Sequence, residues 1–170
     1  RVADGFTQAG IMVHAYLMYG FPTQTLQETV DALEVVRQLF LNEALQSGFW
    51  HRFAMTAHSP VGLAPEQFKV QRTGPNFGGF ADNDLYHHDP SGANHDLFSD
   101  SLSKSLFNFM HGGGLDFPLS KWFDFKIPKT TIKPDFIERS LNDNDEGAPK
   151  ENAMVVWLGN MPAIEMFEAK

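Results

Sequence analysis

The sequence predicts a mixed fold, between α/β and α+β, in which a strand–helix–strand (βαβ) unit is followed by an irregular α+β extension. An almost unbroken apolar run at residues 11–19 is followed by an amphipathic helical pattern and then by a second strand candidate at residues 49–56. Beyond Pro60 the chain becomes rich in turn residues. We therefore divide the chain into residues 1–60, which hold the βαβ unit, and residues 61–170, which hold the extension.

The first strand is predicted at residues 11–19, with the sequence IMVHAYLMY, between Gly10 and Gly20. A continuous apolar run of this length is typical of a strand that is buried on both faces of a parallel sheet. Pro22 then turns the chain, because proline has no N–H for a strand ladder and its φ is fixed.

A helix is predicted next, because Thr25 and Glu28 have the spacing of a capping box. The apolar residues behind them recur at helical spacing: Leu26, Val30, Leu33, Val36 and Phe40. We expect this helix to continue to about Gln46 and to stop at Gly48. The second strand, FWHRFAMT at residues 49–56, completes the βαβ unit, whose two strands should be parallel.

The extension is predicted to begin with a long irregular loop at residues 61–94, since glycine and proline turn signals recur along it. A helix capped by Asp96 should follow and end at Gly112. Short proline-started helices are expected at residues 118–125 and 134–141. A polar excursion at residues 142–152 and two short strands at residues 154–158 and 163–167 complete the prediction.

Composition narrows the class of function. The chain has 170 residues, a formal net charge of −8 and no cysteine. The negative charge argues against nucleic-acid and anionic-membrane partners. No apolar run approaches the ~20 residues that span a bilayer, so we expect a cytoplasmic protein. The lack of cysteine excludes disulfides, thiolate metal sites and a cysteine nucleophile from this chain.

The most informative stretch is Tyr19-Gly20-Phe21-Pro22-Thr23-Gln24-Thr25, at the end of the first strand. Together with that strand it resembles the fifth strand and following turn of the radical S-adenosylmethionine (SAM) enzymes. The likeness is to the YGxPxQT form of the oxygen-independent coproporphyrinogen oxidase-like and B12-associated members. The segment HRFAMTAHSP at residues 51–60 resembles the sixth strand of the same partial (β/α) barrel. The resemblance implies that residues 1–60 form the last strands of this barrel and that the extension closes its mouth on the substrate side.

The resemblance also implies a set of cofactor-binding residues. Carried over by position, Met18 and Gly20 would flank the SAM nucleoside, and Phe53, Ala54 and Met55 would lie near its adenine. Apolar side chains and backbone donors at a strand edge suit a flat heteroaromatic ring. The ends of barrel strands are also where such folds place their chemistry.

One face of the first strand would, by the same resemblance, point into the interior of the barrel. Alternate residues of a strand share a face, and here they include His14, Tyr16 and Met18. We assign no residue of this chain a catalytic role.

The chain also departs from the family. Radical SAM enzymes hold a 4Fe–4S cluster with three closely spaced cysteines after the first strand, and this chain has neither those cysteines nor the earlier strands. It has Thr23-Gln24-Thr25 where some members carry an acidic residue, and it begins at Arg1. We therefore expect a C-terminal piece that is inactive alone and binds no cofactor, with SAM and the cluster held by the parent protein. Its expected partners are the upstream part of the same polypeptide, an unidentified small-molecule or protein substrate and, through an exposed strand edge, a second copy.

Two other interpretations remain open. His87, His88 and His95 offer imidazole ligands for Zn, Fe or Ni, as a small metallohydrolase would require. Adjacent histidines seldom bind one ion together, so solvated loop histidines are favoured and no metal site is assigned. An acidic, aromatic-rich chain with a long central loop is also compatible with a non-enzymatic binding or interaction module.

Overall fold

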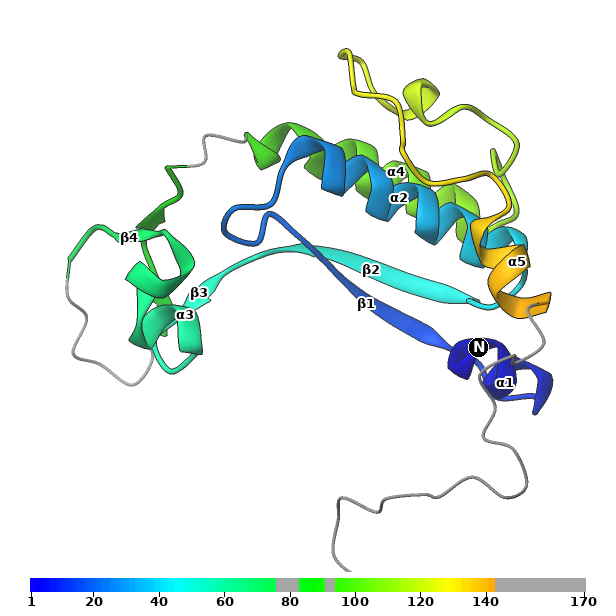
Figure 1. The fold of residues 1–170 in the computed structure, drawn as a ribbon, viewed down its shortest axis with the longest axis horizontal. Helices are drawn as coiled ribbons and strands as arrows, with labels where there is room; N and C mark the ends of the chain where they lie inside the picture. The colour runs from blue at the N-terminus through cyan, green and yellow to red at the C-terminus, as the bar shows by residue number, and fades with distance from the viewer. Residues whose placement is uncertain (76–82, 91–93, 143–170) are drawn as a thin grey trace, which may run out of the picture.

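The computed structural model describes residues 1–75, 83–90 and 94–142. This part of the chain has a mixed α/β fold with five α-helices, short 3-10 turns and small two-stranded sheets (Figure 1). It begins with helix α1, strand β1, helix α2 and strand β2, which span Val2–Gln8, His14–Tyr19, Leu26–Leu41 and Ser47–Arg52. The sequence patterns do not predict α1, which buries none of its residues.

Strands β1 and β2 pair in parallel and are joined by α2, which confirms the predicted βαβ unit. The prediction that the first strand is buried on both faces is wrong, because its residues alternate between exposed and covered positions. Helices α2 and α4 (Ser99–Met110) lie on the same side of the strand pair (Figure 1). The side chains that point the other way have no cover in the described part of the chain, and no closed barrel forms there.

Helix α2 begins at the predicted capping box. The Thr25 hydroxyl accepts a hydrogen bond from Glu28 N, and the Glu28 carboxylate accepts one from Thr25 N. The helix ends at Leu41, before the expected Gln46, because Glu43 has a φ of 56° and so leaves the right-handed helical region.

The second predicted strand, residues 49–56, is interrupted. Strand β2 ends at Arg52, and Met55–Thr56 form a separate strand, β3, which pairs antiparallel with β5 (Asp84–Leu85). Phe53 N–H still donates to the Tyr19 carbonyl at 2.8 Å, and the chain then leaves the parallel pair. Tertiary packing causes the interruption, since Met55 is fully buried in a second apolar cluster.

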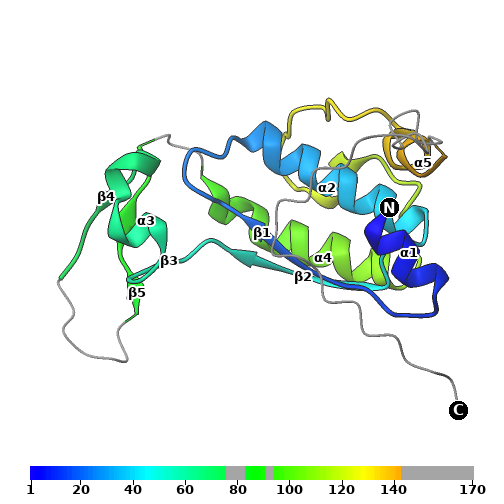
Figure 2. The same cartoon turned by 60° about the horizontal axis from the view of Figure 1, so that its bottom comes forward.

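Residues 60–90 carry short elements where the sequence predicts an irregular loop. Besides β5 they are helix α3, a 3-10 turn, strand β4 and strand β6, which span Pro60–Leu63, Pro65–Phe68, Gln71–Arg72 and His87–His88. Strands β4 and β6 pair antiparallel. This group stands beside the main layer (Figure 2), around a small cluster of Phe53, Met55, Val61, Val70 and Leu85.

Helix α4 lies where the sequence predicts it, but it begins differently. A 3-10 turn, His95–Phe98, precedes the helix, and the Asn94 side chain, in place of Asp96, caps this turn, whereas the N-cap of α4 itself is Phe98 and makes no side-chain hydrogen bond. The Asn94 carbonyl oxygen accepts from Asp96 N at 3.3 Å. As predicted, the helix is stopped by Gly112, whose φ is 71°.

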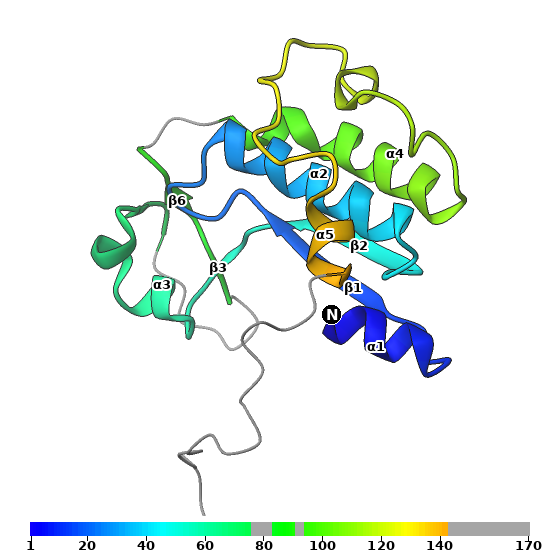
Figure 3. The ribbon, with the colours of Figure 1, turned by 45° about the vertical axis from the view of Figure 1, so that its right-hand side comes forward.

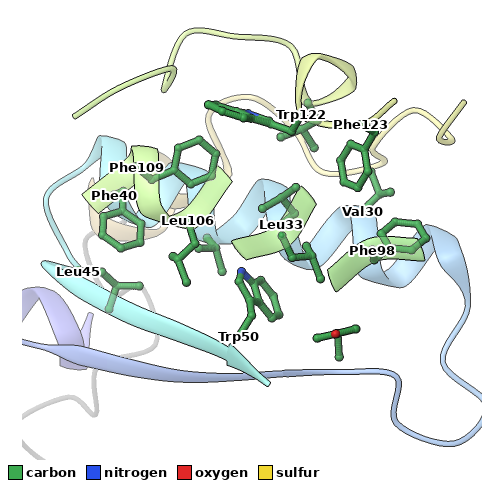
Figure 4. Packing of buried hydrophobic residues seen from close by; sticks show 14 residues of the cluster. Val30, Leu33, Phe40, Leu45, Trp50, Phe98, Leu106, Phe109, Trp122 and Phe123 are labelled. Atoms are coloured by element: carbon green, nitrogen blue, oxygen red, sulfur yellow. The ribbon is translucent and has the colours of Figure 1, made fainter. Parts of the chain in front are cut away.

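The main core lies between the strand pair and helices α2 and α4 (Figure 4). Leu33 from α2, Trp50 from β2 and Leu106 from α4 meet at its centre, and Trp122 closes it from above in that view. Trp122 belongs to a 3-10 turn, Leu119–Trp122, within the predicted segment 118–125. The core therefore takes residues from both sides of residue 60.

The segment after Trp122 returns to α2 and ends in helix α5 (Phe136–Asn142), close to the predicted 134–141 (Figure 3). Asp31 accepts hydrogen bonds from the Thr130 hydroxyl, the Thr131 hydroxyl and Thr131 N, each at 2.7 Å. Burial opposes the charged carboxylate, but these hydrogen bonds prevail and lower the pKa of Asp31.

The predicted polar excursion beyond residue 142 and the strands at residues 154–158 and 163–167 lie outside the described residues. Within the described ranges, no helix has the length and apolar character needed to cross a membrane.

Candidate functional site

The side of the β1–β2 pair that faces away from α2 and α4 is the candidate site, and we call it the uncovered face. It is formed by alternate residues of the two strands: His14, Tyr16, Met18, Ser47, Phe49 and His51. Their register places Tyr16 opposite Phe49 and Met18 opposite His51. Tyr16 is 74% exposed, Phe49 52% and Met18 45%. Parallel strands rarely present such side chains to solvent.

The rings of the uncovered face form one contiguous group around Tyr16. The Tyr16 ring centre lies 5.9 Å from that of Phe49, 5.4 Å from that of His51 and 6.3 Å from that of His14. These are the tilted and edge-on arrangements that aromatic pairs prefer. The face carries no carboxylate, lysine or arginine, so it suits a flat, uncharged group better than an anion.

The carboxyl edge of β1 is a tight turn that leads into α2. Gly20 has a φ of 75°, which favours glycine, and Thr23 has a φ of 71°. Gly20 N–H donates to Gln24 Oε1 at 2.5 Å, and Thr23 N–H donates to the Asp89 carboxylate at 3.1 Å. The turn is therefore held both by its own glutamine and by a residue far along the chain.

The amino end of α2, which follows this turn, does not offer an anion site. Its free N–H groups would attract a phosphate or carboxylate. The chain's own Glu28 already takes that position, where the backbone N–H and then the hydroxyl of Thr25 lower its pKa by hydrogen bonding.

The structure separates the five residues that the resemblance assigns to SAM. Met18 lies on the uncovered face and Gly20 at its carboxyl edge. Ala54 is exposed at the break after β2, whereas the side chains of Phe53 and Met55 are buried in the second cluster.

The Phe53 ring, instead of facing the strand edge, packs edge-on against Phe21 at 5.1 Å and against His87 at 5.6 Å between ring centres. Its N–H is already bonded to the Tyr19 carbonyl and so is not free for a ligand.

The histidines considered as metal ligands are not gathered into a site. His87 and His88 lie in β6, where they pair with Arg72 and Gln71, and His95 is buried under the β1–α2 turn. Within the described ranges, no three His, Asp or Glu side chains lie close enough together to hold a metal ion. The described residues therefore give the metallohydrolase interpretation no support.

Sequence reasoning missed Phe49 and His51, which stand opposite Tyr16 and Met18 on the uncovered face. The signal was present, since these residues alternate with Trp50, but the sequence of residues 49–56 does not indicate which face of the strand is covered. It also missed the ion pair between Arg52 and Asp96, which joins the end of β2 to the turn before α4.

Comparison of the chain with protein-family models, with curated proteins and with solved structures finds no match. The function is therefore inferred from the residues of the chain and their geometry.

Proposed function

We propose that this chain is the C-terminal part of a radical SAM enzyme, in which it contributes two neighbouring strands of a partial (β/α) barrel and an extension on the substrate side. The observation that carries the proposal is the uncovered face of β1 and β2. In a (β/α) barrel the helices cover the outside of the strands, and the other face lines the interior. The side of α2 and α4 corresponds to the outside, and the uncovered face to the interior.

A parallel pair of strands is incomplete by itself. Parallel sheets occur almost only with both faces covered, and among the described residues helices cover only one face of this pair. Additional strands beside β1 or β2 would extend the sheet and enclose Tyr16 and Phe49. The YGxPxQT turn at the carboxyl edge gives the proposal its specificity for the radical SAM family.

The residues at this edge fit one side of a SAM pocket. Met18 presents an exposed thioether, Gly20 ends β1 without a side chain, and Ala54 is exposed after β2. We assign Phe53 and Met55 a supporting role behind the pocket, because their side chains pack in the second cluster. The chain has no cysteine, so the ligands of the 4Fe–4S cluster would come from the upstream part of the polypeptide.

When bound to the reduced cluster, SAM supplies radical chemistry that removes a hydrogen atom from a substrate. The residues of this chain would bind and orient the ligands beside that reaction. The rings of Tyr16, Phe49 and His51 offer van der Waals and stacking contact to an uncharged flat group. By covering the reacting atoms they would also exclude water and other hydrogen donors.

The coding sequence upstream of Arg1 is the first test. We expect it to encode three closely spaced cysteines and earlier strand–helix units in the same reading frame. A reading frame without such a cysteine motif would refute the proposal.

The second test uses the complete polypeptide, purified without oxygen, reduced with dithionite and assayed for release of 5′-deoxyadenosine from SAM. Met18→Ser should raise the KM for SAM by about three- to tenfold, the size of one lost apolar contact. Met12→Ser is the matched control, because Met12 is 77% exposed and precedes β1. Equal KM values in the two variants would contradict the placement of Met18 beside the cofactor.

A further inference from the structure

We propose that His95 is a positioning residue that holds the turn between β1 and α2, and through it the carboxyl edge where SAM would bind. The proposal rests on the proposed function for its ligand, but its geometry is independent of that function. His95 is 5% exposed and lies in the 3-10 turn before α4, 71 residues from its hydrogen-bond partner Gln24. It is the one buried histidine among the described residues.

The hydrogen bond of His95 has a defined direction. Its Nε2 lies 2.9 Å from the Gln24 carbonyl oxygen. A carbonyl oxygen only accepts, so Nε2 carries the proton and donates it. This bond fixes the backbone of the turn at a point beyond the last residue of β1.

Gln24 connects His95 to the end of strand β1 through two hydrogen bonds. Its backbone carbonyl is bonded to His95, and its side-chain Oε1 accepts from Gly20 N–H at 2.5 Å. The path from His95 through Gln24 therefore reaches Gly20, which the proposed function places beside the nucleoside.

The His95 side chain also packs directly on the turn. A Cβ at Gly20 would lie 3.3 Å from the Cβ of His95, and the φ of Gly20 is 75°. The close approach of His95 thus adds to the requirement for glycine at the carboxyl edge. Packing and hydrogen bonding together hold the turn in one conformation.

Packing alone does not explain a histidine at this position. The Nδ1 atom of His95 is buried and has no hydrogen-bond partner in the described part of the chain. A buried polar atom without a partner is unfavourable, and phenylalanine would fill the space without it. We therefore attribute the presence of histidine at this position to the hydrogen bond from its Nε2 to Gln24.

The same segment makes a second contact that serves as a control. Asp96, the next residue, forms an ion pair with Arg52, but the two side chains are 66% and 52% exposed. Exposed ion pairs contribute little, so Asp96→Asn should leave the turn in place.

The experiment compares His95→Phe, His95→Gln and Asp96→Asn in the complete polypeptide. Glutamine carries its Nε2 the same number of bonds from Cβ as histidine and can keep the hydrogen bond, whereas phenylalanine keeps the volume alone. In His95→Phe we expect the KM for SAM to rise about tenfold with kcat changed less than about twofold, and the other two variants to remain within about twofold of the unchanged protein. If His95→Phe leaves the KM unchanged, or if His95→Gln is as impaired as His95→Phe, the positioning role is overturned.

Hydrogen exchange tests the role of His95 independently of whether the proposed function is correct. The Gly20 amide should exchange about tenfold faster in His95→Phe and at the original rate in His95→Gln. If the unchanged protein does not cleave SAM, the proposed function is wrong, and the exchange rates alone decide the role of His95. Equal protection of Gly20 in all variants would overturn that role.

Discussion

Substitution of the buried residue Gln38 tests how the segment after Trp122, which ends in α5, is attached to α2. Gln38 is completely buried, and its Nε2 donates to Glu34 Oε1 at 2.8 Å and to the Lys133 carbonyl at 2.7 Å. Its Oε1 accepts from Ile137 N–H at 3.0 Å. Gln38→Glu keeps the shape of the side chain, but it replaces the double donor with an acceptor that faces two other acceptors.

The cost can be worked from these contacts. Each buried acceptor that loses its donor costs about 1–3 kcal/mol, and the new carboxylate adds a buried like charge beside Glu34. We expect a total of about 3–5 kcal/mol at neutral pH. Local detachment of the segment that contains Lys133 and Ile137 would limit the measured loss to the free energy of that detachment.

Two measurements together test this reasoning. Urea unfolding, followed by the fluorescence of the core tryptophans, gives the global loss, and exchange of the Ile137 amide gives the local one. Gln67→Glu makes the same chemical change at an exposed position and should alter stability by less than about 0.5 kcal/mol. If Gln38→Glu matches that control and the Ile137 amide stays protected, the hydrogen bonds of Gln38 do not hold the segment.

Three further predictions concern the core, a helix end and pH. Leu33→Ala should destabilise the protein by about 2–5 kcal/mol in urea unfolding, because Leu33 is fully buried in the main core; a loss below about 1 kcal/mol would contradict this packing. Gly114→Ala should lower the melting temperature far more than Gly112→Ala: both glycines have positive φ, but only at Gly114 would the new Cβ collide with the Trp122 ring. Since the folded-state pKa of Asp31 is lowered, its contribution is complete above the unfolded-state pKa and is lost as pH falls through the folded-state value. The stability difference between the unchanged protein and Asp31→Asn should therefore shrink on acidification. A difference independent of pH would show that the bonds from Thr130 and Thr131 do not stabilise the charged form of Asp31.

The start of α2, within the βαβ unit, and the end of α4 could be predicted because their signals are local. The capping box of Thr25 and Glu28 marks the start of α2, and Gly112 marks the end of α4. In both cases the residues that decide the structure are within a few positions of one another, so a single sequence is enough.

The ends of the strands and the state of their faces could not be predicted in this way. The pattern of residues 49–56 is that of one continuous strand, and only the second apolar cluster, which buries Met55, breaks it after Arg52. Likewise, Tyr16 and Met18 have the apolar character of buried residues although the structure leaves them exposed. Apolar character shows that a side chain needs cover, and does not show which part of the chain supplies it.

The candidate site divides along the same line. The proposed roles of Met18 and Gly20 rest on a short motif that adjoins them, whereas those of Phe53 and Met55 rest on a continuous strand that the structure interrupts. The role of His95 depends on a contact with Gln24 that spans 71 residues, which no local pattern encodes.

The edges of the strand pair favour the barrel proposal over a non-enzymatic interaction module. Among the described residues, β1 and β2 pair only with each other, so each has an outer edge with unpaired backbone groups. A partner that docks on Tyr16 and Phe49 would cover the uncovered face but would leave both outer edges without hydrogen bonds. Continuation of the sheet by further strands pairs those edges and, as the sheet curls, also encloses the face. Continuation of the sheet therefore accounts for both the uncovered face and the unpaired outer edges, and a (β/α) barrel requires that continuation.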